Sequence, residues 1–217
     1  MAVAFDASSF FEVGGSPQTF LHTPVGVPRG VLMFSMVLAD IAGIGSVRYG
    51  GVVVPLLTEA RDVGFGRARA FFLGAGIPAG PRIVELESIG GAGARDFYCI
   101  SMTANRDVEV LGPPVLVQET GTLVEQNMDT GVRQARRFAG CIVGDGQPFE
   151  GSNSTPPQGH HLMDFGTGAS ATVYETVPGA GSRPVGFDMV DSVERAAIHL
   201  AIGEVSGIAI GRSNLRW

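Results

Sequence analysis

The chain has 217 residues, of which 45% are hydrophobic and 17% are charged, so it can bury a core and does not belong to the disordered class. Its net charge is −6 and all 15 basic residues are arginine. They form no basic stripe of the kind that nucleic-acid binding needs, and no apolar run approaches the ~18 residues of a membrane span. We therefore expect a globular protein with no nucleic-acid partner and no membrane partner.

The N-terminal segment lacks the features of a secretory signal. It has no basic residue before the first apolar stretch, and Asp6 interrupts that stretch. We therefore expect a protein made in the cytoplasm without a signal peptide. In that setting Cys99 and Cys141 are predicted to be buried thiols rather than disulfide partners.

Short apolar stretches separated by Gly and Pro turns recur along the chain, and almost none has the 3.6-residue spacing of an amphipathic helix. The one helical candidate is residues 58–63. In chain order, the segments predicted to be strands are 18–22, 30–38, 46–49, 52–57, 67–73, 82–86, 96–103, 115–119, 136–143, 171–174, 185–189 and 196–203.

The strands differ in how apolar their two faces are. Arg67 and Arg69 alternate with apolar residues, so their shared face is expected to meet water, whereas residues 31–34 and 198–202 are apolar on both faces. Such a mixture is typical of two packed antiparallel sheets. The sequence predicts an all-β fold, an antiparallel β-sandwich of jelly-roll-like type. It forms a single domain over residues 1–210, with a long loop at about 145–161 and a C-terminal tail at 211–217.

His160, His161 and Asp164 are the only cluster of metal-ligand residue types. Adjacent residues on an extended segment point to opposite sides, so the two histidines are poorly placed to chelate one ion. The prediction is a solvated pair in a loop, and a hydrolase built on these three residues is the weaker alternative.

Three glycine-containing segments resemble parts of known sites. Asp129-Thr-Gly matches the aspartic protease triplet, which needs a second copy on an apolar strand, so a turn is predicted instead. Gly43-Ile-Gly45 and Gly91-Ala-Gly93 do not complete a phosphate-binding GxGxxG and are predicted to be β-turns.

The remaining polar motifs are predicted to be solvated surface. Glu85 and Glu87 have the spacing to share one exposed face of a strand, and the same solvated interpretation applies to Asp188 and Asp191. The sequon at Asn153 has no role without secretion. The sequence thus predicts no catalytic residue, no cofactor and no metal ligand, and we expect the protein not to be an enzyme.

Four segments in order resemble a β-sandwich module of tailed-phage virion proteins, over roughly residues 1–145. They are Phe20-Leu-His-Thr, Arg29-Gly-Val-Leu-Met-Phe-Ser-Met-Val, Ser46-Val-Arg-Tyr-Gly-Gly-Val and Ala70-Phe-Phe-Leu-Gly-Ala-Gly-Ile-Pro-Ala-Gly. The chain departs from the module's pattern at Phe71, which replaces the usual first aromatic, and at residues 74–76, inserted before Pro78. The resemblance implies a minor tail or head-decoration protein and no catalytic residue.

These observations together predict a non-enzymatic structural component of a phage or phage-like particle, placed in the virion as a tail protein or a head-surface protein. Its partners would be other virion proteins and, through homo-oligomer formation, further copies of itself. The alternative is a carbohydrate- or receptor-binding module that recognises a host-surface glycan. With one Trp and three Tyr in the chain, a stacking platform for sugars is poorly supplied.

Overall fold

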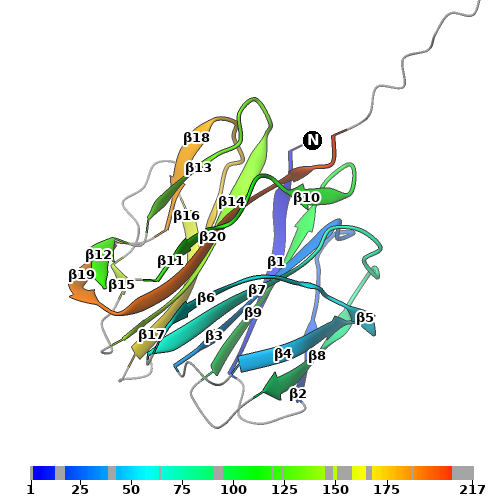
Figure 1. Cartoon of the computed structure of the whole chain (residues 1–217). Helices are drawn as coiled ribbons and strands as arrows, with labels where there is room; N and C mark the ends of the chain where they lie inside the picture. Colours follow the sequence, from blue (N-terminus) through cyan, green and yellow to red (C-terminus); the bar gives the residue numbers. More distant parts are fainter. Residues whose placement is uncertain are drawn as a thin grey trace, which may run out of the picture.

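The computed structural model is all-β, with 68% of residues in strands and no helix in the part of the chain that it describes. That part comprises residues 2–12, 18–38, 43–63, 65–89, 95–118, 120–123, 125–144, 149–150, 158–164, 168–186 and 188–206. The strands form antiparallel sheets packed face to face (Figure 1), which confirms the predicted β-sandwich.

The first half of the chain forms a jelly roll. One sheet has the strand order β1-β9-β3-β7-β6 and the other has the order β2-β8-β4-β5. The first strand lies beside the last and the second beside the eighth, as in the eight-stranded jelly roll, with β6 added beside β7. We call them the inner and the outer jelly-roll sheet. Their strands are β1 (Ala4–Glu12), β2 (Gln18–His22), β3 (Gly30–Val37), β4 (Gly43–Tyr49), β5 (Val52–Val53), β6 (Leu56–Asp62), β7 (Gly66–Leu73), β8 (Arg82–Ile89) and β9 (Arg95–Thr103).

The second half of the chain adds a third large sheet and two small ones. The C-terminal sheet has the order β10-β20-β14-β17-β16, with β11 also paired to β20. A two-stranded ribbon, β13–β18, and the small sheet β12-β19-β15 complete the fold. These strands are β10 (Val108–Val110), β11 (Val115–Val117), β12 (Gly121–Leu123), β13 (Gln126–Asp129), β14 (Ala135–Gly144), β15 (Phe149–Glu150), β16 (Gln158–Asp164), β17 (Gly168–Glu175), β18 (Ser182–Val185), β19 (Asp188–Val193) and β20 (Arg195–Glu204).

Three hydrophobic cores join four layers. Val31 and Met33 of β3 pack toward the outer jelly-roll sheet, whereas Leu32 and Phe34 of the same strand pack toward the C-terminal sheet. A third core lies between the other face of the C-terminal sheet and the β13–β18 ribbon, where Met128 is buried. The inner jelly-roll sheet and the C-terminal sheet are thus covered on both faces, which explains their strands that are apolar throughout. In Figure 1 the layers follow one another from β2, β4 and β8 at the lower right to β13 and β18 at the upper left.

Tyr49-Gly-Gly51 forms a hairpin turn between β4 and β5. Tyr49 pairs with Val52 across a two-residue turn, and Gly50 and Gly51 have φ angles of 55° and 82°. Two successive residues with positive φ define the type I′ turn, which suits the twist of a hairpin and favours glycine at both positions.

The helix expected at residues 58–63 is wrong, because residues 58–62 belong to edge strand β6 and Val63 lies in the turn that follows. Glu59 lies opposite Arg69 in the antiparallel register and forms ion pairs with both Arg67 and Arg69, at 3.6 Å and 2.5 Å. The two arginines share a face as predicted, but Arg67 is buried rather than turned to water, since the carboxylate on the neighbouring strand compensates its charge.

Two predicted connections are also strand in part. Gly43-Ile-Gly45 was expected to be a β-turn but begins β4, with a register shift between Ile44 and Ser46. The loop expected at about 145–161 contains β15 and the first residues of β16. Its other residues, like Gly91-Ala-Gly93 and the tail at 211–217, lie outside the described residues.

Candidate functional site

The cluster His160, His161 and Asp164 lies in β16, an edge strand of the C-terminal sheet. In the backbone register His160 is opposite Val173, His161 opposite Thr172 and Asp164 opposite Ala169. The structure therefore places the three residues along a strand, whereas the two histidines were predicted to lie in a loop. Among the described residues there is no group of three or more His, Cys, Asp and Glu side chains that could hold a metal ion.

The Asp129-Thr-Gly triplet forms the predicted turn, between β13 and β14. The Asp129 carboxylate accepts a hydrogen bond of 2.9 Å from the amide of Gly131, whose φ is 56°. Thr130 donates its hydroxyl to the carbonyl of Arg133 at 2.8 Å. The neighbouring loop supports the turn from outside, because the amide of Gly181 donates to the carbonyl of Gly131 at 2.7 Å.

The paired carboxylates are surface residues, as predicted for Glu85 and Glu87. Both are exposed on β8, where Glu87 accepts a hydrogen bond of 2.8 Å from Ser46 and Glu85 stands opposite Arg48 in the register. Asp188 and Asp191 lie in β19, and Asn153 falls outside the described residues.

Three buried polar groups were not foreseen from the sequence. The first is His22, whose Nδ1 lies 2.8 Å from the hydroxyl of Ser9 and whose ring makes an edge contact with Tyr49. Burial lowers the pKa of His22 to about 4, although Asp6 opposes the change. A neutral imidazole with no exposed surface packs between the two jelly-roll sheets and is closed to a substrate.

The second group joins the inner jelly-roll sheet to the C-terminal sheet. Ser170 of β17 donates to the carboxyl of Asp96 and lies 2.8 Å from the hydroxyl of Tyr98. Burial raises the pKa of Asp96 to about 7; the hydrogen bond from Ser170 opposes this rise and the nearby charge of Glu12 adds to it.

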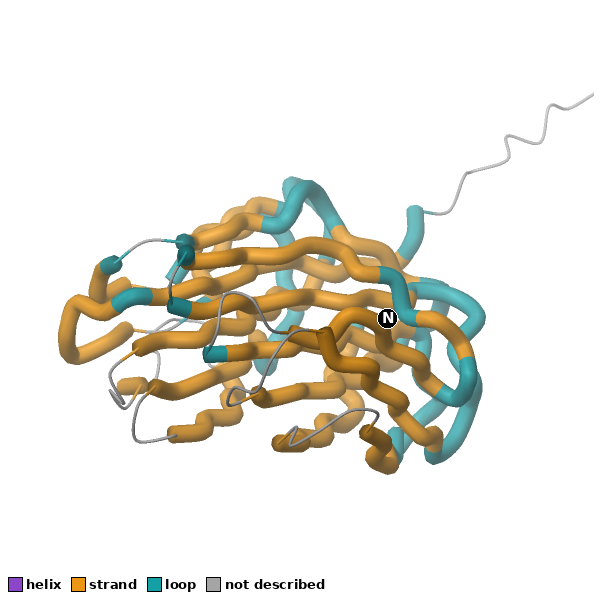
Figure 2. The backbone as a smooth tube through the Cα atoms, turned by 60° about the horizontal axis from the view of Figure 1, so that its bottom comes forward, coloured by secondary structure: helices purple, strands orange, loops and turns teal. Residues whose placement is uncertain are grey.

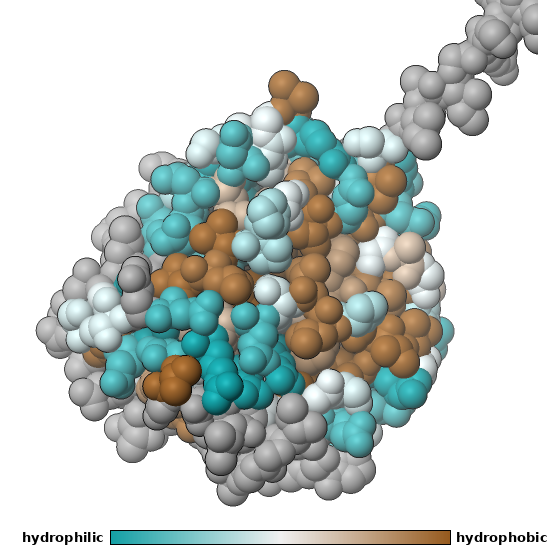
Figure 3. All heavy atoms as spheres, in the orientation of Figure 1, coloured by the Kyte–Doolittle hydropathy of each residue, from teal (hydrophilic) through white to brown (hydrophobic). Residues whose placement is uncertain are grey.

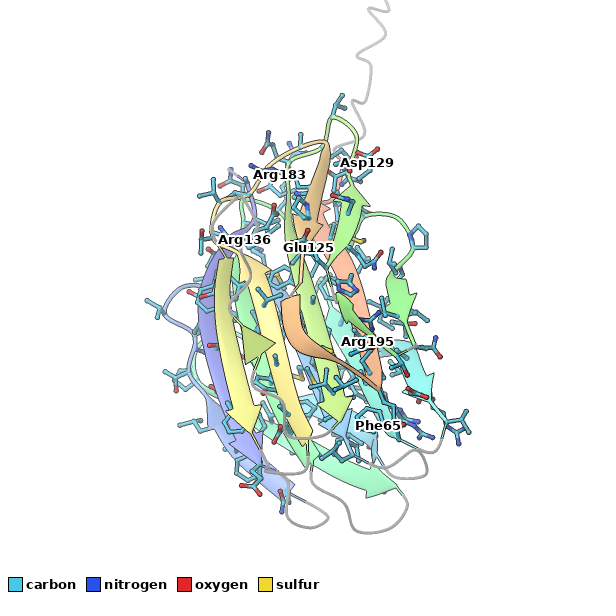
Figure 4. All side chains as sticks on the ribbon, turned by 90° about the vertical axis from the view of Figure 1, so that its left-hand side faces the viewer. Phe65, Glu125, Asp129, Arg136, Arg183 and Arg195 are labelled. Atoms are coloured by element: carbon cyan, nitrogen blue, oxygen red, sulfur yellow. The ribbon has the colours of Figure 1, made fainter. Side chains whose placement is uncertain are left out.

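The third group is an ion pair that attaches the β13–β18 ribbon to the C-terminal sheet. Arg137 and Glu175 have no exposed side-chain surface and are 3.0 Å apart. Arg137 also donates to the carbonyls of Met128 at 2.8 Å and of Gly179 at 3.2 Å. Arg183 contacts the same carboxylate at 3.3 Å. These bonds fix the end of the ribbon, where Arg183 and Asp129 lie in Figure 4.

Unlike these buried groups, the loops at one end of the sheets form a surface that is accessible to solvent. At this end β2, β9 and β20 finish while β3, β8 and β14 begin, and we call it the loop end. Figure 2 shows its loops together at the right of the view. Among the described residues, most of the exposed large hydrophobic side chains belong to it: Leu21, Val25, Val27, Val52, Val53, Ile83, Val132, Val177 and Val205.

Two parts of the loop end have a defined shape. One is the turn at Asp129–Arg133, which presents Val132 with 95% of its surface exposed; hydrophobic atoms cap the top of the molecule there in Figure 3. The other is a hollow of about 410 Å³ on the outer jelly-roll sheet, lined by Leu21, Ile83 and Arg82 together with Gly50, Gly51, Pro78, Pro81 and Glu85. Exposed apolar residues next to Gly or Pro, such as Val25, Val132 and Val177, were a sequence signal for this surface.

Comparison with known proteins adds no relative: no family model matches the chain, and no curated protein matches it. In the described part of the chain, no helix has the length and apolar character to span a membrane. Cys99 and Cys141 are buried free thiols, as predicted, and burial raises the pKa of both.

Proposed function

We propose that this chain is a non-enzymatic structural component of a phage or phage-like particle, on the tail or the head surface, and that it acts through protein–protein contacts. One observation carries the proposal. The four segments that resemble the virion module coincide with β2, β3, the β4–β5 hairpin and β7, which are strands of a jelly roll. The jelly roll is a fold of viral capsid proteins.

The loop end supports the mode of action. Scattered apolar residues are normal on a surface, but apolar residues gathered at one end favour a protein contact. Val25 and Val27 lie on a loop that is held in place, because the Asp6 carboxylate accepts hydrogen bonds from the backbone amides of Val25 and Gly26, at 3.2 and 2.7 Å. A pre-formed apolar loop loses little conformational entropy when a partner covers it.

The experiment is to mix the purified chain with particles of the same source that lack it and to separate bound from free chain by sedimentation. The expected result is saturable co-sedimentation at a fixed copy number, which separates a head decoration from a tail ring. Val25→Asp should weaken binding, whereas Val63→Asp, a matched exposed valine beyond the opposite end of β6, should not. A chain that never sediments with the particles contradicts the proposal.

The second candidate is a carbohydrate- or receptor-binding module, since the jelly roll is also a lectin fold and the hollow beside Arg82 is open to solvent. Against it, Phe10 is the only aromatic among the exposed large hydrophobic side chains of the described residues, and sugar sites depend on aromatic stacking surfaces. Specific binding on a glycan array that Arg82→Ala abolishes would favour this candidate over the first.

A further inference from the structure

The loop end carries a projection and a depression on opposite outer layers of the molecule. The projection is the turn Asp129–Arg133, which follows the β13–β18 ribbon, the layer beyond the C-terminal sheet. The depression is the hollow on the outer jelly-roll sheet. Because the two lie at opposite ends of the stack of layers, one copy of the chain can present its projection to the depression of the next.

The projection is rigid and apolar at its tip. The bonds of Thr130, Gly131 and Gly181 described above fix its backbone, and the Arg133 side chain is held by Glu109 at 2.7 Å. Val132 is left with 95% of its surface in water. Within one copy of the chain this valine stays almost fully exposed, although the turn that carries it is fixed.

The depression offers the projection an apolar surface and one guanidinium, that of Arg82, while the exposed Glu85 that also lines it stands opposite Arg48. Leu21 and Ile83 are direct neighbours in the β2–β8 register and both are exposed, so they provide an apolar floor. The guanidinium of Arg82 makes a single long hydrogen bond of 3.5 Å, to the carbonyl of Pro81, within the described part of the chain. Its Nε is buried without a hydrogen-bond partner, so a carboxylate from outside would be bound by the terminal N–H groups of Arg82, whose one bond to Pro81 is long.

We propose that copies of this chain associate head to tail, with Val132 of one copy on Leu21 and Ile83 of the next and with Asp129 paired to Arg82. The occupant of the hollow is therefore a second copy. The Asp129 carboxylate is exposed and uses one oxygen for its own turn, which leaves the other for the guanidinium. A contact between two different surfaces is heterologous, and repetition closes it into a ring when the rotation permits. This inference deepens the proposed function and rests on it, because it gives the particle component its own symmetric assembly.

Cross-linking between two different variants tests the geometry. One preparation carries Val132→Cys and the other Ile83→Cys, and a short bis-maleimide is added to the mixture. The native thiols are fully buried, so the introduced cysteines are the reactive ones. We expect a heterodimer from the mixture and a ladder of oligomers from the double variant. Val63→Cys replaces Val132→Cys in the control, since Val63 is 79% exposed, and should give no heterodimer.

Association measured by light scattering over a concentration series tests the contacts. Val132→Ser should weaken association by about 10- to 100-fold, the effect of burying one valine side chain. Arg82→Gln and Asp129→Asn should each weaken it by about 2- to 5-fold, the range of a surface ion pair. Their double variant should be no weaker than either single variant, because both remove the same pair.

A cross-link no stronger than that of the Val63→Cys control overturns the inference, as does a cross-link between two Val132→Cys chains, which would indicate a symmetric contact of tip on tip. The particle-binding experiment is independent of this result. If the chain binds particles but gives no head-to-tail cross-link, only the assembly inference is contradicted. If it gives the cross-link but does not bind particles, the proposed function is contradicted.

Discussion

Replacing Asp96 by Asn should change how the stability of the fold depends on pH. Asp96 has no exposed surface, and its pKa is about 7 in the folded protein against an ordinary value of 3.8. Each unit of pKa is worth about 1.4 kcal/mol, so the difference corresponds to about 4 kcal/mol. The folded state holds the proton more tightly than the unfolded chain does. The contribution of Asp96 to stability is therefore complete below pH 3.8, falls as the pH rises toward about 7, and is lost above that value.

The variant removes this loss because an amide does not ionise. Its oxygen can still accept the hydrogen bond that Ser170 donates to Asp96, although its NH₂ group takes the place of an oxygen that is buried without a partner and costs about 1–3 kcal/mol. We expect Asp96→Asn to be less stable than wild type at low pH and more stable above pH 7. The difference between the two proteins should change by about 4 kcal/mol across the range.

The assay is urea unfolding of both proteins at a series of pH values, since subtracting their free energies of unfolding cancels the titration of all other groups. Ser170→Ala provides a second check. The hydrogen bond from Ser170 lowers the pKa of Asp96, so its loss should move the fall in stability to higher pH. A difference between wild type and Asp96→Asn that is constant with pH would refute the reasoning.

Three further predictions concern packing and burial. Gly140→Ala should destabilise the fold by about 1–3 kcal/mol or more, because its Cβ would lie 2.5 Å from the ring of Phe34 on the facing sheet; thermal unfolding measures this. Glu175→Gln should cost about 3–5 kcal/mol in urea unfolding by leaving buried Arg137 without its counter-charge, whereas Glu109→Gln, in a half-exposed pair, should cost at most about 1 kcal/mol. Both native thiols should resist a thiol reagent until the protein is unfolded, because they are fully buried; rapid labelling of the folded protein would contradict the structure.

The sequence determined the fold class because that information is local. Gly-Gly after Tyr49 marks a hairpin, period-two alternation marks strands with two different faces, and runs apolar on both faces mark sheets covered on both sides. The turn at Asp129-Thr-Gly and the burial of both thiols followed in the same way. The helix predicted at residues 58–63 was wrong because the position of Glu59 depends on a contact with another strand. Its carboxylate pairs with the arginines of β7, and short-range spacing in the sequence does not show that contact.

Only the tertiary structure decided how the strands are layered and what lies at their ends. The sequence suggested two packed sheets, whereas the C-terminal sheet and the β13–β18 ribbon extend the jelly roll to four layers. The buried groups around Asp96 and Arg137 join residues 74 and 38 positions apart, so no local pattern announces them. The loop end exists for the same reason: Leu21, Ile83 and Val132 are far apart in the chain, and the strand order brings these apolar residues to one end of the molecule.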